Sequence, residues 1–122
     1  MLSINETFQG HLIQCKVIKM GEDINMMIEG GDISHIGAVA LGIAVQMPHN
    51  INKMTASVSL LTVPGHKEDD VVLKYAKRLV QELGVTSVVT CGIHIQNITF
   101  EEIQELMDII DDLVTRAIEQ LK

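Results

Sequence analysis

Aromatic residues are almost absent from this chain. Among its 122 residues only Phe8, Tyr75 and Phe100 carry an aromatic ring, and tryptophan does not occur. Domains that stack nucleic-acid bases need several aromatic side chains on one surface. Basic residues are also scarce: 9 lysines and arginines stand against 16 aspartates and glutamates, which gives a net charge of −7. Because phosphate backbones require a basic patch, we expect no nucleic acid among the partners.

Long apolar runs and cysteine pairs are lacking too. No apolar run approaches the length of about 20 residues that a membrane-spanning helix needs, and residues 1–10 lack the basic and apolar regions of a signal peptide. We therefore expect a cytoplasmic protein with no membrane contact. Cys15 and Cys91 are far apart and form no CxxC pair, which predicts reduced core thiols. A hydrophobic content of 47% excludes a disordered chain, and the length predicts a single domain over residues 1–122.

What the first half does contain is the pattern of strands. Apolar and polar residues alternate over residues 8–20, 24–29 and 54–63, as in half-buried strands. Residues 36–47 are almost wholly apolar. Their β-branched side chains and two interior glycines favour a strand over a helix, and we expect a central strand that is covered on both faces.

The pattern changes to a helical period after Pro64. Apolar residues recur at spacings of three and four over residues 72–83, with Gly84 as a terminator. A short strand over residues 85–95 follows. A second helix then begins after Thr99, whose spacing from Glu102 fits a capping box.

The order ββββαβα predicts an α+β fold. We expect a mainly antiparallel five-stranded sheet with both helices on one face. Such a sheet leaves an apolar face uncovered, and we expect a homodimer to cover it.

A glycine-rich loop precedes the central strand. Gly30, Gly31 and Asp32 stand just before His35, where the chain enters the apolar run. Glycine permits positive φ and lets a ligand approach the backbone closely. The alternative is a tight connection in which His35 is simply hydrogen-bonded.

Three histidines share this setting, because His35, His66 and His94 each lie near a glycine at the edge of an apolar strand. If the fold brings them together with Glu68, the set His35, His66, Glu68 and His94 would suit a divalent transition metal. The alternative is three separate histidines that cap turns.

His66 and Lys67 also precede a helix, whose N-terminal amides favour anions. An ordinary helix cap is the alternative there, and the P-loop pattern is missing. No serine or cysteine stands in a nucleophile elbow. The residues alone therefore predict a ligand site at the strand ends without a catalytic nucleophile.

Three segments, taken in order, resemble one known family. Residues 30–41, 63–68 and 92–103 are similar to the prenylated-flavin chaperone family, the small LpdD-like proteins associated with gallate decarboxylase. An acidic residue often follows the GIHI segment in that family, whereas this chain has Gln96.

The resemblance implies a non-catalytic accessory protein that binds prenylated FMN and helps to deliver or mature it for a UbiD-type decarboxylase. The cofactor contacts that it implies are Gly30, Gly31, Asp32, His35, His66, Lys67 and Asn97. Two alternatives stay open. One is a protein-binding chaperone similar to the small proteasome-assembly chaperones, and the other is a small metal-dependent lyase that uses His35, His66 and His94.

Overall fold

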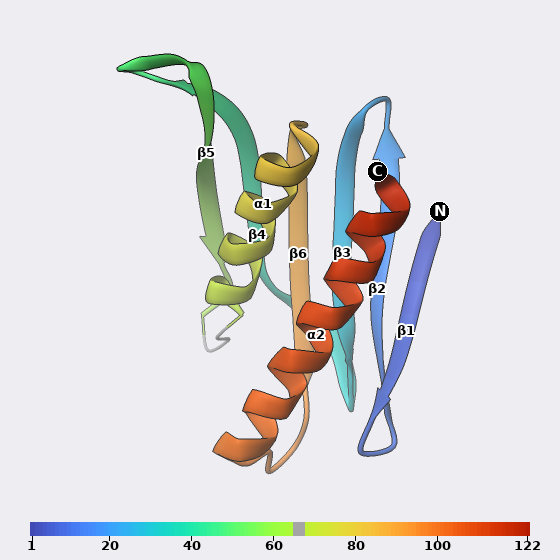
Figure 1. Ribbon diagram of the computed structural model, residues 1–122. Helices are drawn as coiled ribbons and strands as arrows, with labels where there is room; N and C mark the ends of the chain where they lie inside the picture. Colours follow the sequence, from blue (N-terminus) through green and yellow to red (C-terminus); the bar gives the residue numbers. More distant parts are fainter. Residues whose placement is uncertain (65–67) are drawn as a thin grey trace.

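The computed structural model describes residues 1–64 and 68–122, and for residue 51 the backbone only. The described chain forms six strands and two helices (Figure 1). Their order is β1 (Leu2–Phe8), β2 (His11–Met20), β3 (Asp23–Gly31), β4 (Ile33–Met47), β5 (Asn50–Thr62), α1 (Asp69–Leu83), β6 (Ser87–His94) and α2 (Phe100–Leu121).

The strands form one mixed sheet in the order β1-β2-β3-β6-β4-β5. All neighbouring pairs are antiparallel except β3 and β6, which run parallel. Both helices lie on the same face of this sheet (Figure 1): α1 covers β4, β5 and β6, while α2 crosses β1 and β2. The predicted α+β class with two helices is therefore confirmed.

The prediction of a mainly antiparallel five-stranded sheet differs from the structure in two respects. The first strand, β1, was not predicted, and it is joined to β2 by a tight turn in which Gln9 and Gly10 both adopt positive φ. The second respect is β6, which lies between β3 and β4 and pairs with both. Alternation along each strand predicts its exposed face but not its neighbours, so this insertion has no local signal.

The core fills the space between the sheet and the helices. Ile13, Met26 and Val89 from the sheet, with Leu79 of α1 and Leu113 of α2, are almost completely buried there. The helix ends follow the sequence signals. Gly84 ends α1 in the left-handed conformation, and Thr99 with Glu102 forms the expected capping box. Cys15 and Cys91 are free and buried, as predicted.

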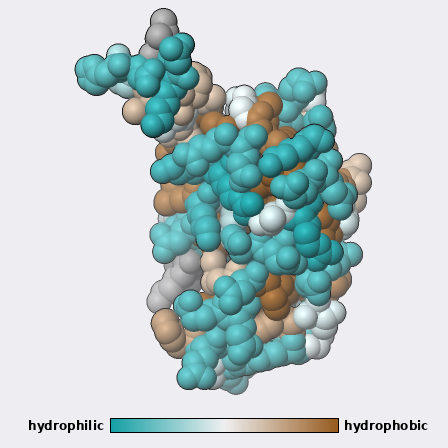
Figure 2. Space-filling view, viewed as in Figure 1, coloured by the Kyte–Doolittle hydropathy of each residue, from teal (hydrophilic) through white to brown (hydrophobic). Residues whose placement is uncertain are grey.

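The other face of the sheet is open within the described chain. Leu41, Ile43 and Leu61 point away from the helices and are exposed, so β4 is not covered on both faces as the sequence suggested. At one end the β4–β5 hairpin stands out from the body as a hydrophilic arm (Figure 2). Neither helix in the described part of the chain is long and apolar enough to cross a membrane.

Candidate functional site

A bulge in β4 creates the most unusual feature of the sheet. Ser34 pairs with Ile93 and Ala38 with Cys91, so residues 35–37 of β4 face Gly92 alone. A Cβ at position 92 would lie 1.5 Å from the carbonyl oxygen of His35, which means that only glycine fits there. Bulges re-aim side chains next to functional sites, and this one carries His35.

The carboxylate of Glu68 enters the gap that the bulge leaves. Glu68 stands at the N-cap of α1, is only 9% exposed, and accepts a hydrogen bond from the Ile93 amide at 3.4 Å. This amide faces the irregular part of the β4–β6 ladder. A Cβ at Gly37 would lie 2.2 Å from Oε2 of Glu68, so glycine makes room for the carboxylate.

His35 and Glu68 form a close pair. Nε2 of His35 lies 3.2 Å from Oε1 of Glu68, and Nδ1 of the same ring lies 3.4 Å from the carbonyl oxygen of Ile33. A neutral imidazole has only one N–H, so it can donate to only one of these two oxygens at a time. The pair places two polar groups next to the apolar interior.

An apolar pocket of about 240 Å³ lies beside this pair, between β6, the start of α1 and the first turns of α2. Glu68 and Cys91 are its polar members. Its walls are mostly branched aliphatic side chains, chiefly Ile93, Ile95, Ile98, Ile103, Leu106 and Met107. Burial raises the pKa of the Cys91 thiol, and the nearby Glu68 carboxylate raises it further. Cys91 therefore stays protonated and serves as an apolar wall, not as a nucleophile.

Gly30 and Gly31 are the last residues of β3, and Asp32 alone connects this strand to β4, in place of the loop that the sequence predicted. Both glycines have positive φ, and a Cβ on Gly31 would lie 2.2 Å from the carbonyl oxygen of His94. Asp32 accepts the backbone N–H of Gln96 at 2.7 Å, and its other oxygen lies 3.4 Å from Nδ1 of His11. Asp32 thus fixes the loop between β6 and α2, which supplies Ile95 and Ile98 to the pocket.

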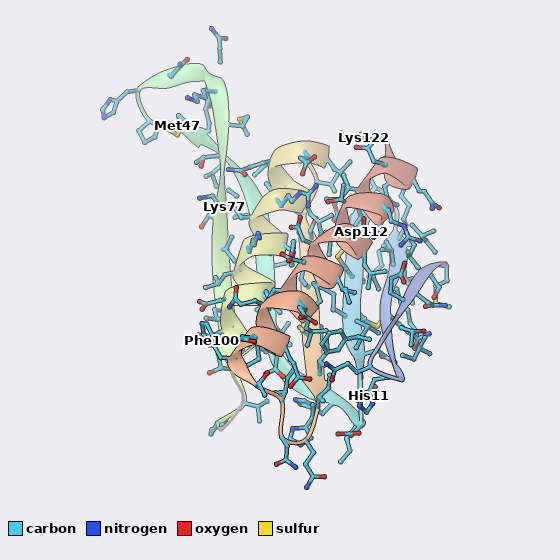
Figure 3. All side chains as sticks on the ribbon, turned by 60° about the horizontal axis from the view of Figure 1, so that its bottom comes forward. His11, Met47, Lys77, Phe100, Asp112 and Lys122 are labelled. Atoms are coloured by element: carbon cyan, nitrogen blue, oxygen red, sulfur yellow. The ribbon has the colours of Figure 1, made fainter. Side chains whose placement is uncertain are left out.

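The loop between β6 and α2, together with the start of α2, presents polar and aromatic groups at the surface. Asn97 is exposed and has a φ of 61°, in the left-handed region that asparagine tolerates. Phe100, the first residue of α2, is 75% exposed. Figure 3 shows Phe100 and His11 at the end of the molecule where these loops gather. This exposed ring lies about one turn before Ile103, which lines the pocket.

The predicted metal set is brought together only in part. His35 and Glu68 are in contact, His94 is exposed at the end of β6, and His66 and Lys67 lie outside the described residues. Within residues 1–64 and 68–122 no group of three potential ligands gathers to hold a metal ion. Both helices also begin with carboxylates, Asp69 and Asp70 in α1 and Glu101 and Glu102 in α2, which oppose an anion at either N-terminus.

Several residues of the site were not identified from the sequence. His11 was not predicted as the partner of Asp32, and the isoleucines of the pocket were read only as core. Gly37 and Gly92 did carry a signal, because an isolated glycine inside a β-branched strand indicates a bulge or a close backbone approach. That both glycines lie at the bulge between β4 and β6, however, depends on the unpredicted position of β6.

Comparisons with known proteins identify the family and the fold of the chain. A family model described as "Prenylated flavin chaperone LpdD-like domain" matches residues 7–122. The chain is 26% identical over 113 residues to "Protein LpdD" of Lactiplantibacillus plantarum, covering 93% of this chain and 79% of that protein. Its fold is also similar to a chain in the crystal structure of a chaperone complex for yeast 20S proteasome assembly. The TM-score is 0.56 at 11% identity, with 99% of this chain and 98% of that chain covered.

Proposed function

We propose that this chain, which belongs to the LpdD-like prenylated flavin chaperone family, binds prenylated FMN in the cytoplasm and helps to deliver or mature it for a UbiD-type decarboxylase. The family is one of chaperones, so the chain is an accessory protein and not an enzyme. Membership of this family argues against the metal-dependent lyase.

The observation that carries this proposal is the pocket beside the His35–Glu68 pair. It lies at the carboxyl ends of β3 and β6, the one parallel pair in the sheet. Ligands of open sheets with parallel strands bind at such ends. Most of the residues that the family resemblance assigned to the cofactor are at this end of the molecule: Gly30, Gly31, Asp32, His35 and Asn97.

The side chains of His66 and Lys67, and not the N-terminal amides of α1, are the proposed contacts for the phosphate group. They lie outside the described residues, and their role stays a prediction. A divalent metal held by His35, His66, Glu68 and His94 likewise stays a prediction. Metal analysis of the purified protein by mass spectrometry tests it, and a stoichiometry near zero after purification without chelator would contradict it.

The experiment that tests cofactor binding is an anaerobic titration of the purified chain with reduced prenylated FMN. We expect a change in the flavin absorption spectrum that saturates at one equivalent per chain, and retention of the flavin through gel filtration. A spectrum that is the simple sum of the two components, with the flavin eluting separately, would refute the proposal.

We also propose that a second copy of the chain covers the open face of the sheet. Six strands at a spacing of ~4.8 Å, with on average about ten residues each at ~3.3 Å, give a footprint of roughly 950 Å². A stable interface buries about 800 Å² per partner. The part of this face over β4 and β5 exposes Leu41, Ile43 and Leu61 beside serines and threonines. Because these side chains are uncharged, two chains of net negative charge would meet there without repulsion between facing carboxylates. Light scattering at micromolar concentration should give twice the chain mass of 13.5 kDa, and a monomer would contradict the proposal.

A purely protein-binding chaperone is the second candidate. The same exposed apolar face favours it, whereas the fold similarity to the proteasome-assembly protein shows the fold alone. This candidate predicts a stable complex with a larger protein and no small ligand. Affinity purification followed by analysis of both proteins and flavins separates the two, because recovered prenylated flavin rules out the second.

A further inference from the structure

The volume of the pocket lies between that of a cavity for a benzene-sized molecule and that of a pocket for a drug-sized ligand. An apolar cavity of about 150 Å³ lined by leucine, isoleucine and phenylalanine holds a benzene-sized molecule. Pockets that bury a whole drug-sized ligand measure about 300–1,000 Å³. At about 240 Å³ this pocket takes a hydrocarbon fragment and is too small for an entire flavin nucleotide.

The chemistry of the walls limits which fragment can enter. Ile93, Ile95, Ile98 and Ile103 are β-branched and stiff, and Met107 is the flexible member that adapts to an irregular shape. Apart from the Glu68 carboxyl group at one end, the weak Cys91 thiol is the one polar side-chain group on these described walls. A polar fragment would lose its hydrogen bonds to water without replacement. The pyrimidine ring, the ribityl chain and the phosphate of a flavin are therefore excluded, and a branched hydrocarbon is favoured.

The mouth of the pocket is held in place before any ligand arrives. Asp32 fixes the loop through the Gln96 amide at 2.7 Å, and the capping box of Thr99 and Glu102 fixes the start of α2. Ile98 and Ile103 flank the capping box and line the pocket. Preorganised walls lower the cost of ordering on binding and sharpen the choice of shape.

We infer that this pocket holds the isoprenoid-derived hydrocarbon part of prenylated FMN and thereby distinguishes the prenylated from the unprenylated flavin. The inference rests on the proposed function and adds the determinant of its specificity. The polar part of the flavin lies outside the pocket, along the exposed edge that carries Asp32 and Asn97. FMN lacks the isoprenoid-derived carbons, so it buries less apolar surface in the pocket and gains less from it.

The test compares the affinities of the intact chain for prenylated FMN and for FMN under anaerobic conditions. We expect the wild type to bind the prenylated form at least tenfold more tightly. Ile103→Trp places a larger side chain at the half-exposed mouth and should reduce this ratio to about one by weakening the prenylated ligand only. Gln104→Trp is the matched control, because Gln104 is exposed on the next position of the same helix and does not line the pocket.

A second variant guards against misfolding of the first. Ile103→Ala removes contacts without adding bulk and should lower the ratio severalfold while leaving FMN binding unchanged. Equal affinities of the wild type for the two flavins would overturn this inference and leave the proposed function standing. An unchanged ratio in both Ile103 variants would also overturn it. Binding of neither flavin would overturn the proposed function, and this inference with it.

Discussion

The two ends of α2 carry one continuous apolar stripe but meet different surroundings. Towards the C-terminus, Leu113, Ala117 and Ile118 are fully buried, and Arg116 pairs with Glu6 of β1 at 3.1 Å. In the first turn, Ile103 is 38% exposed and Phe100 is 75% exposed. One end of the helix therefore closes the core, and the other end keeps apolar surface beside a pocket. The comparison teaches that hydrophobic periodicity predicts where a stripe lies but not what it contacts.

The largest expected effect is at the core end. Leu113→Ala removes a side chain with no exposed surface and should lower the free energy of unfolding by about 2–5 kcal/mol. The flavin affinity of the molecules that remain folded should not change. Urea unfolding measures the first quantity. A decrease in the free energy of unfolding of less than about 1 kcal/mol would contradict the view that this end of α2 closes the core.

The bulge of β4, next to the pocket, is expected to show the next largest effect on stability. Gly37→Ala places a Cβ 2.2 Å from Oε2 of Glu68 and should destabilise the protein by about 1–3 kcal/mol. In a Glu68→Ala background the same substitution should cost less than half as much, because the group it contacts is gone. The four proteins form a double-mutant cycle, and strict additivity would contradict the contact between Gly37 and Glu68.

The capping box at the start of α2 has a smaller expected effect. Thr99→Ala should cost about 1 kcal/mol of unfolding free energy at neutral pH. The side-chain hydrogen bond with Thr99 lowers the pKa of Glu102, and a backbone bond with Thr99 and a side-chain bond with Gln9 lower it further.

A lowered folded-state pKa gives this prediction its pH dependence. The contribution of Glu102 is present above its unfolded pKa of about 4.3 and is lost as the pH falls through the folded pKa. The stability difference between the wild type and Thr99→Ala should therefore shrink as the pH falls from about 5 to about 2. A difference that is constant over this range would argue against the charged cap.

The smallest effect on stability is expected at Ile103, where a substitution should reduce flavin binding most. Ile103→Ala should change the free energy of unfolding by less than about 1 kcal/mol, because its side chain is already half-exposed. Flavin retention should nevertheless fall. Leu113→Ala should show the opposite behaviour, with a large loss of stability and unchanged flavin retention. A Leu113 variant that loses the flavin while an Ile103 variant keeps it would contradict the assignment of the two ends of α2.

The sequence predicted those parts of the fold that local signals determine. Gly84 ends α1 and Thr99 caps α2, as predicted. The predicted glycine-rich loop is wrong, because Gly30 and Gly31 are the last residues of β3 and have long-range partners in the sheet. Strand β1 was missed because Glu6 lies on its inner face, where alternation requires an apolar residue. That charge is satisfied by Arg116, 110 residues away.

The site was predictable to the same degree. His35 and Glu68 were both members of the predicted metal set, and the fold brings them within 3.2 Å of each other. The pocket was not predicted, since its walls come from β6, the following loop and α2, and β6 inserts between β3 and β4 without a local signal. A non-local pairing of this kind is what the pattern of a single strand leaves open.

The most direct test of the account is the methyl NMR spectrum of the methionines during an anaerobic titration with prenylated FMN. Met107 lines the pocket, whereas Met27 lies on β3 and Met54 is exposed on β5. We expect the Met107 methyl signal to shift and saturate with the flavin, while Met27 and Met54 stay unchanged. Bound flavin with an unshifted Met107 signal, or with shifts at Met27 or Met54 in its place, would contradict the assignment of the pocket as the ligand site.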